Sequence, residues 1–256
     1  MSPSSSNETT VKTKRWDWRF AAILPLWVFA VFILVQLILG LILTLALQLG
    51  VSEESLSGPL FNTVATAVIY MATLILAIGV PMWTKKQRVT LTEIGLHRLP
   101  NWADLGMAPI GFIAYFILSG IFIALTPSLL PFVDLNQVQD TGFSGLTGRP
   151  EYILAFLSLV VIAPIAEEII FRGYLLGKLR KYTPLWVSIL ITSLLFALVH
   201  FAWNVGIDVF ALSIVLCLLR VWSKSLWPSI LLHMLKNFVA FYLLFINPSF
   251  LTTLGG

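Results

Sequence analysis

The amino-acid sequence predicts an all-α polytopic membrane protein with about seven transmembrane helices, an eighth or re-entrant element being left open. Hydrophobic residues make up 58% of the 256 residues and charged residues only 11%. A soluble domain is about 45–50% apolar and about 25% charged. A chain of this composition cannot cover its surface with polar groups, so lipid must surround most of it. The same conclusion follows from two further observations, the long uncharged stretches and the placement of Lys and Arg.

The uncharged stretches define the helices, because a helix rising about 1.5 Å per residue needs about 20 apolar residues to cross the hydrocarbon core. No charged residue lies between Arg19 and Glu53 or between Glu54 and Lys85. The first of these stretches is far longer than the apolar core of a signal peptide, about 7–15 residues, so we interpret it as a retained anchor. The other predicted helices are Leu105–Leu130, Tyr152–Leu179, Pro184–Phe201, Val205–Val221 and Leu226–Ile246.

Lys and Arg predict the orientation in the bilayer, because cytoplasmic connections carry an excess of them. With the N-terminus in the cytoplasm and the C-terminus outside, the opposite side receives only Arg149 among the basic residues of the connections. The formal net charge of +4 then describes the inner face of a membrane and gives no reason to expect a nucleic acid partner. The basic residues predicted to be cytoplasmic are Lys12, Lys14, Arg15, Arg19, Lys85, Lys86, Arg88, Arg98, Lys178, Arg180, Lys181, Arg220 and Lys224.

The chain divides into four predicted parts. Residues 1–19 form a polar, Ser/Thr-rich N-terminal segment with nothing to bury, and residues 20–150 hold the first three helices and their connections. Residues 151–247 form a core of four closely spaced helices, and residues 248–256 are a short tail. The single cysteine, Cys217, excludes an intramolecular disulfide and is expected to be a buried apolar residue. The short N-terminal segment and small loops suggest a prokaryotic plasma membrane.

Polar residues concentrate inside the last four helices, although a charge at the centre of a membrane helix costs about 2.5–3.5 kcal/mol on insertion scales. Such residues usually face a cavity or a partner and indicate a functional site. Three motifs carry them, each on a different helix. They are Glu167-Glu168-x-x-x-Arg172, Phe196-x-x-x-His200 and His233-x-x-x-Asn237.

Helical geometry predicts which of these side chains meet. Glu168 and Arg172 are spaced i, i+4 and can pair on one face of the helix. Glu167 is turned about 100° away from Glu168, so we expect that the two glutamates cannot share one partner. His200 is the candidate neighbour of Glu167, because their depths from a turn near Tyr182 differ by roughly one helical turn.

Two further features of the fourth helix indicate close packing around these residues. Gly173 and Gly177 form a Gly-x-x-x-Gly pair that allows another backbone to approach closely. Pro164 precedes the glutamates and frees a backbone carbonyl, with a kink as a further possible effect. Ordinary packing of membrane helices explains both features equally well.

The three motifs, in this order on successive late helices, resemble the CPBP family of CAAX proteases and bacteriocin-processing enzymes, also called Abi or Rce1-like. The resemblance covers about residues 152–241, and the upstream stretch LTEIGLHR is also similar to a segment of such proteins. Each motif alone is weakly specific, whereas all three together are a strong signal. The resemblance implies an intramembrane protease, and every family position in the three motifs is filled.

The resemblance also implies a role for each motif residue. Glu167 would be the general base, with His200 beside it, and together they would activate a water. His233 and Asn237 would donate hydrogen bonds to the oxyanion, and Glu168 with Arg172 would be structural support. The substrate would be a peptide or membrane protein, such as a prenylated CaaX tail or a bacteriocin-type peptide.

The chemistry leaves a metal-dependent alternative open. Glu167, His200 and His233 could form a His₂Glu site for Zn²⁺ with one open position. Asn is a poor zinc ligand, however, and the sequence has no H-E-x-x-H signature, so we favour a glutamate-type mechanism without cofactor.

Two other classes compete with the protease. A proton-coupled transporter also uses Glu and His inside the membrane, although transporters usually show repeats and this sequence shows none. A catalytically silent bacteriocin-immunity or scaffold protein is the other class. Outside the motifs, we expect Lys236 to snorkel or to lie near a carbonyl-lined cavity, with no assigned role. We expect His97 to be solvated, and Asp208 to lie where water reaches the outer end of its helix without a catalytic role.

Overall fold

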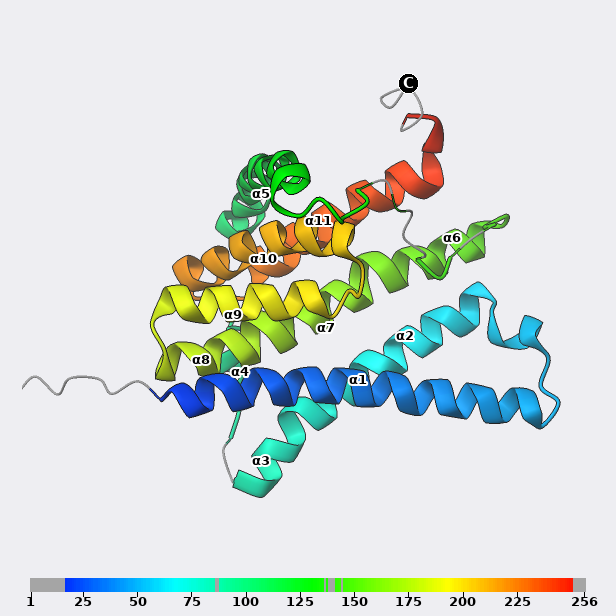
Figure 1. The fold of residues 1–256 in the computed structure, drawn as a ribbon, viewed down its shortest axis with the longest axis horizontal. Coiled ribbons are helices and arrows are strands. Elements are labelled where there is room, and N and C mark those ends of the chain that lie inside the picture. Colours follow the sequence, from blue (N-terminus) through cyan, green and yellow to red (C-terminus); the bar gives the residue numbers. More distant parts are fainter. Residues whose placement is uncertain (1–16, 86–87, 136, 138–140, 144, 251–256) are drawn as a thin grey trace, which may run out of the picture.

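The computed structural model describes residues 17–85, 88–135, 137, 141–143 and 145–250, and within these ranges it contains helices and no strand. Figure 1 shows most helices running along the long axis, with α1 beside α8 and α9. The main helical segments are α1 (Trp18–Gln48), α2 (Pro59–Leu74), α3 (Val80–Lys85), α4 (Leu91–Ile94), α5 (Trp102–Leu129), α6 (Arg149–Phe156), α7 (Ala163–Glu168), α8 (Leu176–Tyr182), α9 (Leu185–Leu198), α10 (Trp203–Ser223) and α11 (Trp227–Phe241).

All seven predicted membrane helices are present, and six of them are long and apolar enough to cross a bilayer. Segments α2 and α3 join through a π-helical stretch into one helix, and α6, α7 and α8 join in the same way into Arg149–Tyr182. The chain is therefore a multi-pass integral membrane protein. Within the described residues the only additional helices are Glu53–Leu56 and α4, and neither is long enough to be an eighth crossing.

The fifth predicted helix is shorter than the sequence suggests. The apolar run continues to Phe201, but α9 ends at Leu198, and Phe201 has a positive φ of 52° in the turn that leads to α10. The 14 residues of α9 rise only about 21 Å, against a hydrocarbon core of about 30 Å. The turn after α9 therefore lies at membrane depth, where irregular backbone is tolerated only inside the protein or beside a cavity.

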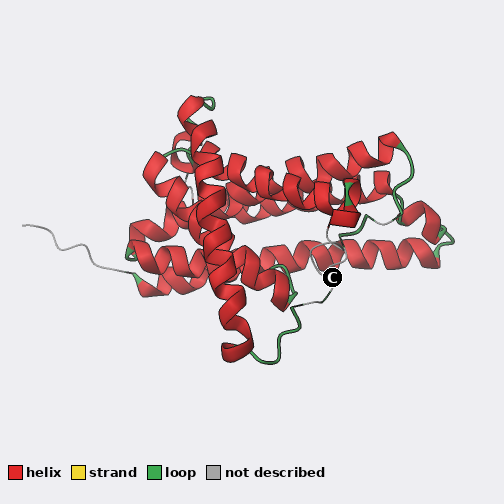
Figure 2. Ribbon diagram, turned by 90° about the horizontal axis from the view of Figure 1, so that it is seen from above, coloured by secondary structure: helices red, strands yellow, loops and turns green. Residues whose placement is uncertain are grey.

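Helix α5 crosses the other helices at a steep angle. Figure 1 shows it nearly end-on, and Figure 2 shows it as the long upright helix across the bundle. It packs against α10 and α11 through a cluster that includes Ala108, Tyr115, Leu212 and Leu232. This contact brings a third helix to the side of α10 and α11.

A proline in the second membrane helix leaves a backbone carbonyl that a side chain of α1 binds. In the stretch between α2 and α3, the carbonyl of Ala77 has no helical donor four residues on, because Pro81 lacks an N–H group. The indole Nε1 of Trp27 donates to this carbonyl at 3.0 Å and so ties α1 to the second membrane helix.

The segment around α4 is fastened across one end of the bundle, near the α8–α9 turn. The Arg220 guanidinium donates to the carbonyl of Glu93 at 3.0 Å, and the Leu226 amide donates to the carbonyl of Gly95 at 2.9 Å. Gly95 has a φ of 89°, and a Cβ there would lie 2.7 Å from the Arg220 guanidinium, so only glycine fits. A Cβ on Gly173 of the Gly-x-x-x-Gly pair would lie 3.1 Å from the Ile94 side chain, so α4 is the element that approaches this pair.

Basic residues flank this segment, and we call this end of the bundle the basic end (Lys178, Arg180, Lys181, Arg220 and Lys224). The Lys181 ammonium donates to the Glu93 carboxylate at 2.8 Å and lowers the pKa of that carboxyl below its ordinary value. A lowered carboxyl pKa stabilises the fold above the unfolded-state pKa, and the contribution is lost as the pH falls through the folded-state pKa. His97, in the same connection, is exposed as predicted.

Candidate active site

Glu168 and Arg172 form the ion pair that their spacing predicts. Arg172 Nη1 lies 2.8 Å from Glu168 Oε1, and both side chains are fully buried. The same carboxylate oxygen accepts a hydrogen bond from His233 Nδ1 on α11 at 2.9 Å. The charge of Glu168 is therefore compensated within the protein, which confirms the predicted pairing.

Glu167 has partners from two other helices. The hydroxyl of Tyr70 on α2 donates to Glu167 Oε1, and His233 Nε2 lies 3.6 Å from Glu167 Oε2. His233 thus lies between the two glutamates, and the expectation that they cannot share a partner is wrong. The physical reason is that an imidazole has a nitrogen on each side, so one ring reaches two carboxylates that point about 100° apart.

His200 lies in the turn after α9 and not inside a helix as predicted. Its Nδ1 lies 2.7 Å from the carbonyl oxygen of Phe196, which can only accept a hydrogen bond, so Nδ1 carries the proton. In the neutral ring Nε2 then keeps a free lone pair. His200 is within electrostatic range of Glu167, but among the described residues no direct hydrogen bond joins the two side chains. The direct partner of Glu167 that sequence reasoning missed is Tyr70.

The ring of Phe196 packs between the motif side chains. It is fully buried, and its centroid lies 5.0 Å from that of His200 and 5.8 Å from that of His233, both edge-to-face. On the remaining side the Arg172 guanidinium carbon lies 4.2 Å from the ring centroid, a cation–π contact. Phe196 therefore fixes the spacing of the two histidines and the arginine.

Asn237 binds a backbone carbonyl that Pro164 leaves without a helical donor. In the π-helical turn Leu157–Ile162 the amide of Ala163 bonds to the carbonyl five residues back, so the carbonyl of Leu159 would need a donor at Pro164. Pro164 has no N–H group, and Asn237 Nδ2 donates to Leu159 instead, at 2.8 Å. The predicted effect of Pro164, a freed carbonyl, is confirmed, and Asn237 keeps one further N–H.

Lys236 and Asp208 differ from what the sequence suggests. Lys236 Nζ lies 3.3 Å from Asp208 Oδ2, so the lysine pairs within the protein and does not snorkel to an interface. Asp208 is half-buried and also bonded to α5, so its surroundings are not simply those of a water-exposed helix end. Sequence reasoning missed this pair because the partners are 28 residues apart on different helices. Cys217 is buried, as expected.

The described side chains do not assemble the alternative zinc site. No three His, Cys, Asp or Glu side chains in the described ranges lie in positions that could hold one metal ion. Both nitrogens of His233 already face glutamates. Glu167, His200 and His233 are therefore not arranged as one metal site in the part of the chain that the structure describes.

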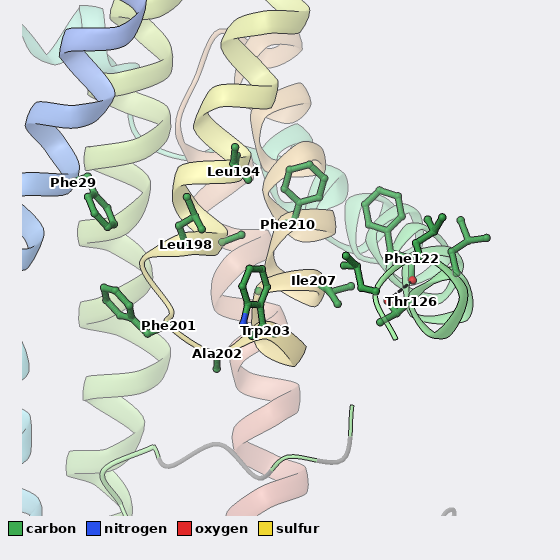
Figure 3. A pocket seen from close by; sticks show the side chains of 15 residues that line it. Phe29, Phe122, Thr126, Leu194, Leu198, Phe201, Ala202, Trp203, Ile207 and Phe210 are labelled. Atoms are coloured by element: carbon green, nitrogen blue, oxygen red, sulfur yellow. Dashed lines mark hydrogen bonds between the residues drawn. The ribbon is translucent and has the colours of Figure 1, made fainter. Parts of the chain in front are cut away.

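An apolar cavity of about 610 Å³ lies beside the His200 turn. Figure 3 shows side chains from α5, α9, α10 and the turn around it, with Phe122, Leu198, Phe201 and Phe210 labelled. Its volume falls in the range of small-molecule sites, about 300–1,000 Å³. The polar groups on its lining side chains are the Thr126 hydroxyl and the Trp203 indole N–H, and the Thr126 hydroxyl already donates to the carbonyl of Phe122.

Comparisons with known proteins identify the same part of the chain. Residues 149–239 match the family model of the Rce1-like type II CAAX prenyl endopeptidases. The membrane-embedded CAAX protease MroQ of Staphylococcus aureus is 32% identical over 95 residues, 34% of this chain and 38% of that protein. An uncharacterised 24.3 kDa protein of Escherichia coli is 34% identical over 90 residues, which cover 33% and 42% of the two chains.

A further relative extends the match slightly. The UPF0177 protein YxdF of Lactococcus lactis is 30% identical over 109 residues, 42% of this chain and 60% of that protein. The chain therefore spans between 38% and 60% of the length of these three relatives. No solved structure matches the chain. Residues 149–239, which contain all three motifs, are thus the part of the chain that is similar to the Rce1-like type II CAAX prenyl endopeptidases.

Proposed function

We propose that the protein is an intramembrane endopeptidase of the glutamate type, in which Glu167 and His200 activate the water that hydrolyses a peptide bond. The observation that supports this most strongly is the unequal environment of the two glutamates. Glu168 is bound by Arg172 and His233, whereas Glu167 is bound by a neutral phenol and faces His233 across 3.6 Å. A carboxylate without a full ion pair is the better proton acceptor.

The first step begins with a water between Glu167 and His200. Glu167 accepts one proton of the water as the hydroxide oxygen bonds to the substrate carbonyl carbon. His200 Nε2, unprotonated in the neutral ring, accepts the second hydrogen bond of the water and orients it. The carbonyl π electrons move to the oxygen, which becomes the oxyanion.

The oxyanion would be stabilised by His233 and by the second N–H of Asn237. His233 Nδ1 faces the Glu168 carboxylate, so the ring would donate to the oxyanion through Nε2 when that nitrogen carries a proton. When the intermediate collapses, the C–N bond breaks and Glu167 returns its proton to the leaving amine. Glu167 is then ionised again and the cycle closes.

The apolar cavity beside His200 supports a proposal for the class of substrate. A peptide that carries a large apolar group near the scissile bond would place that group in the cavity and its carbonyl near Glu167. A prenylated CaaX tail and an apolar bacteriocin-type peptide both meet this requirement. The match to prenyl endopeptidases supports the first of these, and the bacterial relatives leave room for the second.

We also propose a cytoplasmic N-terminus in a prokaryotic plasma membrane. The backbone amide of Asp17, where α1 begins, donates to the carbonyl of Tyr182 at 3.0 Å, so the start of α1 lies at the basic end. The positive-inside rule places that end in the cytoplasm. In this orientation α1 begins at the cytoplasmic side of the membrane.

The test of the protease function compares the peptide termini of two membrane proteomes. One comes from cells that carry the native protein, and the other from cells that carry Glu167→Gln at equal abundance. We expect new termini within or beside apolar segments in the native sample alone. Identical termini in both samples would contradict the protease and favour a proton-coupled transporter or a silent scaffold.

Metal removal tests the choice of mechanism. We expect the purified protein to keep its cleavage activity in the presence of 1,10-phenanthroline or EDTA, because no step requires a Lewis acid. Metal analysis of the same preparation should find no stoichiometric zinc. A loss of activity that added Zn²⁺ restores would instead support the metal site formed by Glu167, His200 and His233.

A further inference from the structure

A second group of polar side chains lies inside the membrane-spanning region, outside the three motifs. The carboxylate of Asp208 on α10 accepts hydrogen bonds from Tyr115 and Ser119 on α5, both at 2.7 Å through Oδ1. Its other oxygen, Oδ2, lies 3.3 Å from Lys236 Nζ on α11. These four residues join three helices, and we call them the Asp208 cluster.

Joining helices through ionisable side chains costs more free energy than joining them through apolar contacts. Apolar residues of similar volume often replace a buried ion pair with no loss of stability or with a gain. Ionisable groups inside a membrane are rare and usually serve a function. Three donors on one carboxylate also restrict where the aspartate lies, and therefore where its lysine partner lies.

The lysine end of the cluster borders the candidate active site. Lys236 follows His233 by three residues, which places the two on neighbouring parts of one helix face. Lys236 is also within electrostatic range of His200, the same ring that Glu167 reaches. Its side chain is 20% exposed, so the ammonium is only partly buried.

The position of the Lys236 ammonium matters because negative charge moves during the proposed reaction. In the proposed reaction the negative charge of Glu167 moves to the oxygen of the substrate carbonyl. A fixed positive charge at the edge of a poorly solvated site stabilises that developing charge without reorganisation. Arg172 is not available for this role, because its side chain is fully buried against the Glu168 carboxylate and the Phe196 ring.

We propose that the Asp208 cluster is a positioning device for the proposed reaction, in which Asp208, Tyr115 and Ser119 fix the Lys236 ammonium beside the site and its charge stabilises the transition state. This inference rests on the protease function. Lys236 is a positioning residue here, since it acts on the reacting atoms through space and not by contact.

The experiment separates the charge of Lys236 from its contribution to folding. The assay is hydrolysis of a fluorogenic peptide in bicelles, built on the cleaved sequence identified from the native and Glu167→Gln membranes. Lys236→Met leaves the Asp208 carboxylate without its cation, so we expect both the unfolding temperature and kcat to fall. The double variant Asp208→Asn/Lys236→Met leaves no unpaired charge, so its unfolding temperature should return close to the native value.

The decisive expectation concerns kcat in the stable double variant. Because the positive charge is still missing, kcat should remain at least about tenfold below native while KM stays near native. Lys236→Arg should recover most of the rate. Lys181→Met, which removes a cation from the exposed pair with Glu93, is the matched control and should leave kcat unchanged.

Each outcome has a separate meaning. A double variant that regains both stability and native kcat would show that the cluster only holds the helices together and would overturn the inference. Equal cleavage by the native protein and Glu167→Gln, or no cleavage by either, would overturn the protease function itself.

Discussion

Replacing Glu167 with glutamine should lower kcat by at least about 10²-fold, because the amide cannot accept a proton from water and general-base catalysis contributes about 10²–10⁴-fold. The amide oxygen can still accept the hydrogen bond from Tyr70, so we expect the variant to fold as the native protein does. The measurement is the rate of peptide hydrolysis at saturating substrate, with the unfolding temperature recorded in the same detergent.

Glu53→Gln is the control for this prediction, since Glu53 is exposed in the short helix between α1 and α2 and lies outside the candidate site. It should hydrolyse the peptide at the native rate. His200→Ala should be as inactive as Glu167→Gln if both residues hold one water. Native turnover by Glu167→Gln would remove Glu167 from the mechanism.

Arg172→Met should have the largest effect on stability. It leaves the fully buried Glu168 carboxylate without its cation, and breaking a buried pair in this way costs about 3–5 kcal/mol. The hydrogen bond from His233 remains but does not replace the guanidinium, whose contact with the Phe196 ring is lost as well. The measurement is the free energy of unfolding in mixed micelles titrated with SDS.

A second variant shows whether the loss comes from the uncompensated charge. Glu168→Gln/Arg172→Met removes both charges and should recover most of the lost stability. Lys181→Met, at an exposed pair worth about 0–1 kcal/mol, should change the free energy of unfolding little. A double variant as unstable as Arg172→Met would mean that packing, not charge, holds this part of the helix.

The membrane helices and the Glu168–Arg172 pair could be predicted because they depend on short-range features of the sequence. The length of an uncharged apolar run sets a span, and an i, i+4 spacing sets a pair on one helix face. Both follow from local geometry. The end of α9 could not be predicted in this way, because neither Gly nor Pro interrupts the sequence from Leu198 to Phe201.

Contacts between helices that are distant in the sequence could not be predicted from spacing within one helix. Tyr70 is a single phenol in an apolar helix, 97 residues from Glu167, and nothing in its own segment marks it as a partner. The position of His233 between two carboxylates depends on how α11 packs against α7, which spacing within either helix does not contain. The contact between Asn237 and Leu159 is partly predictable. Pro164 frees a backbone carbonyl within the preceding turn, and such a carbonyl needs a donor from another helix.

The shortness of α9 has a consequence for how the proposed hydrolysis could proceed inside a membrane. A helix about 9 Å shorter than the hydrocarbon layer can be accommodated by a thinner bilayer or by a water-filled indentation over its end. Either adjustment brings bulk solvent down toward the residues that follow Leu198. The water consumed in the proposed reaction then has to cross only part of the hydrocarbon layer. The thickness of the membrane would therefore affect how readily water reaches the reaction.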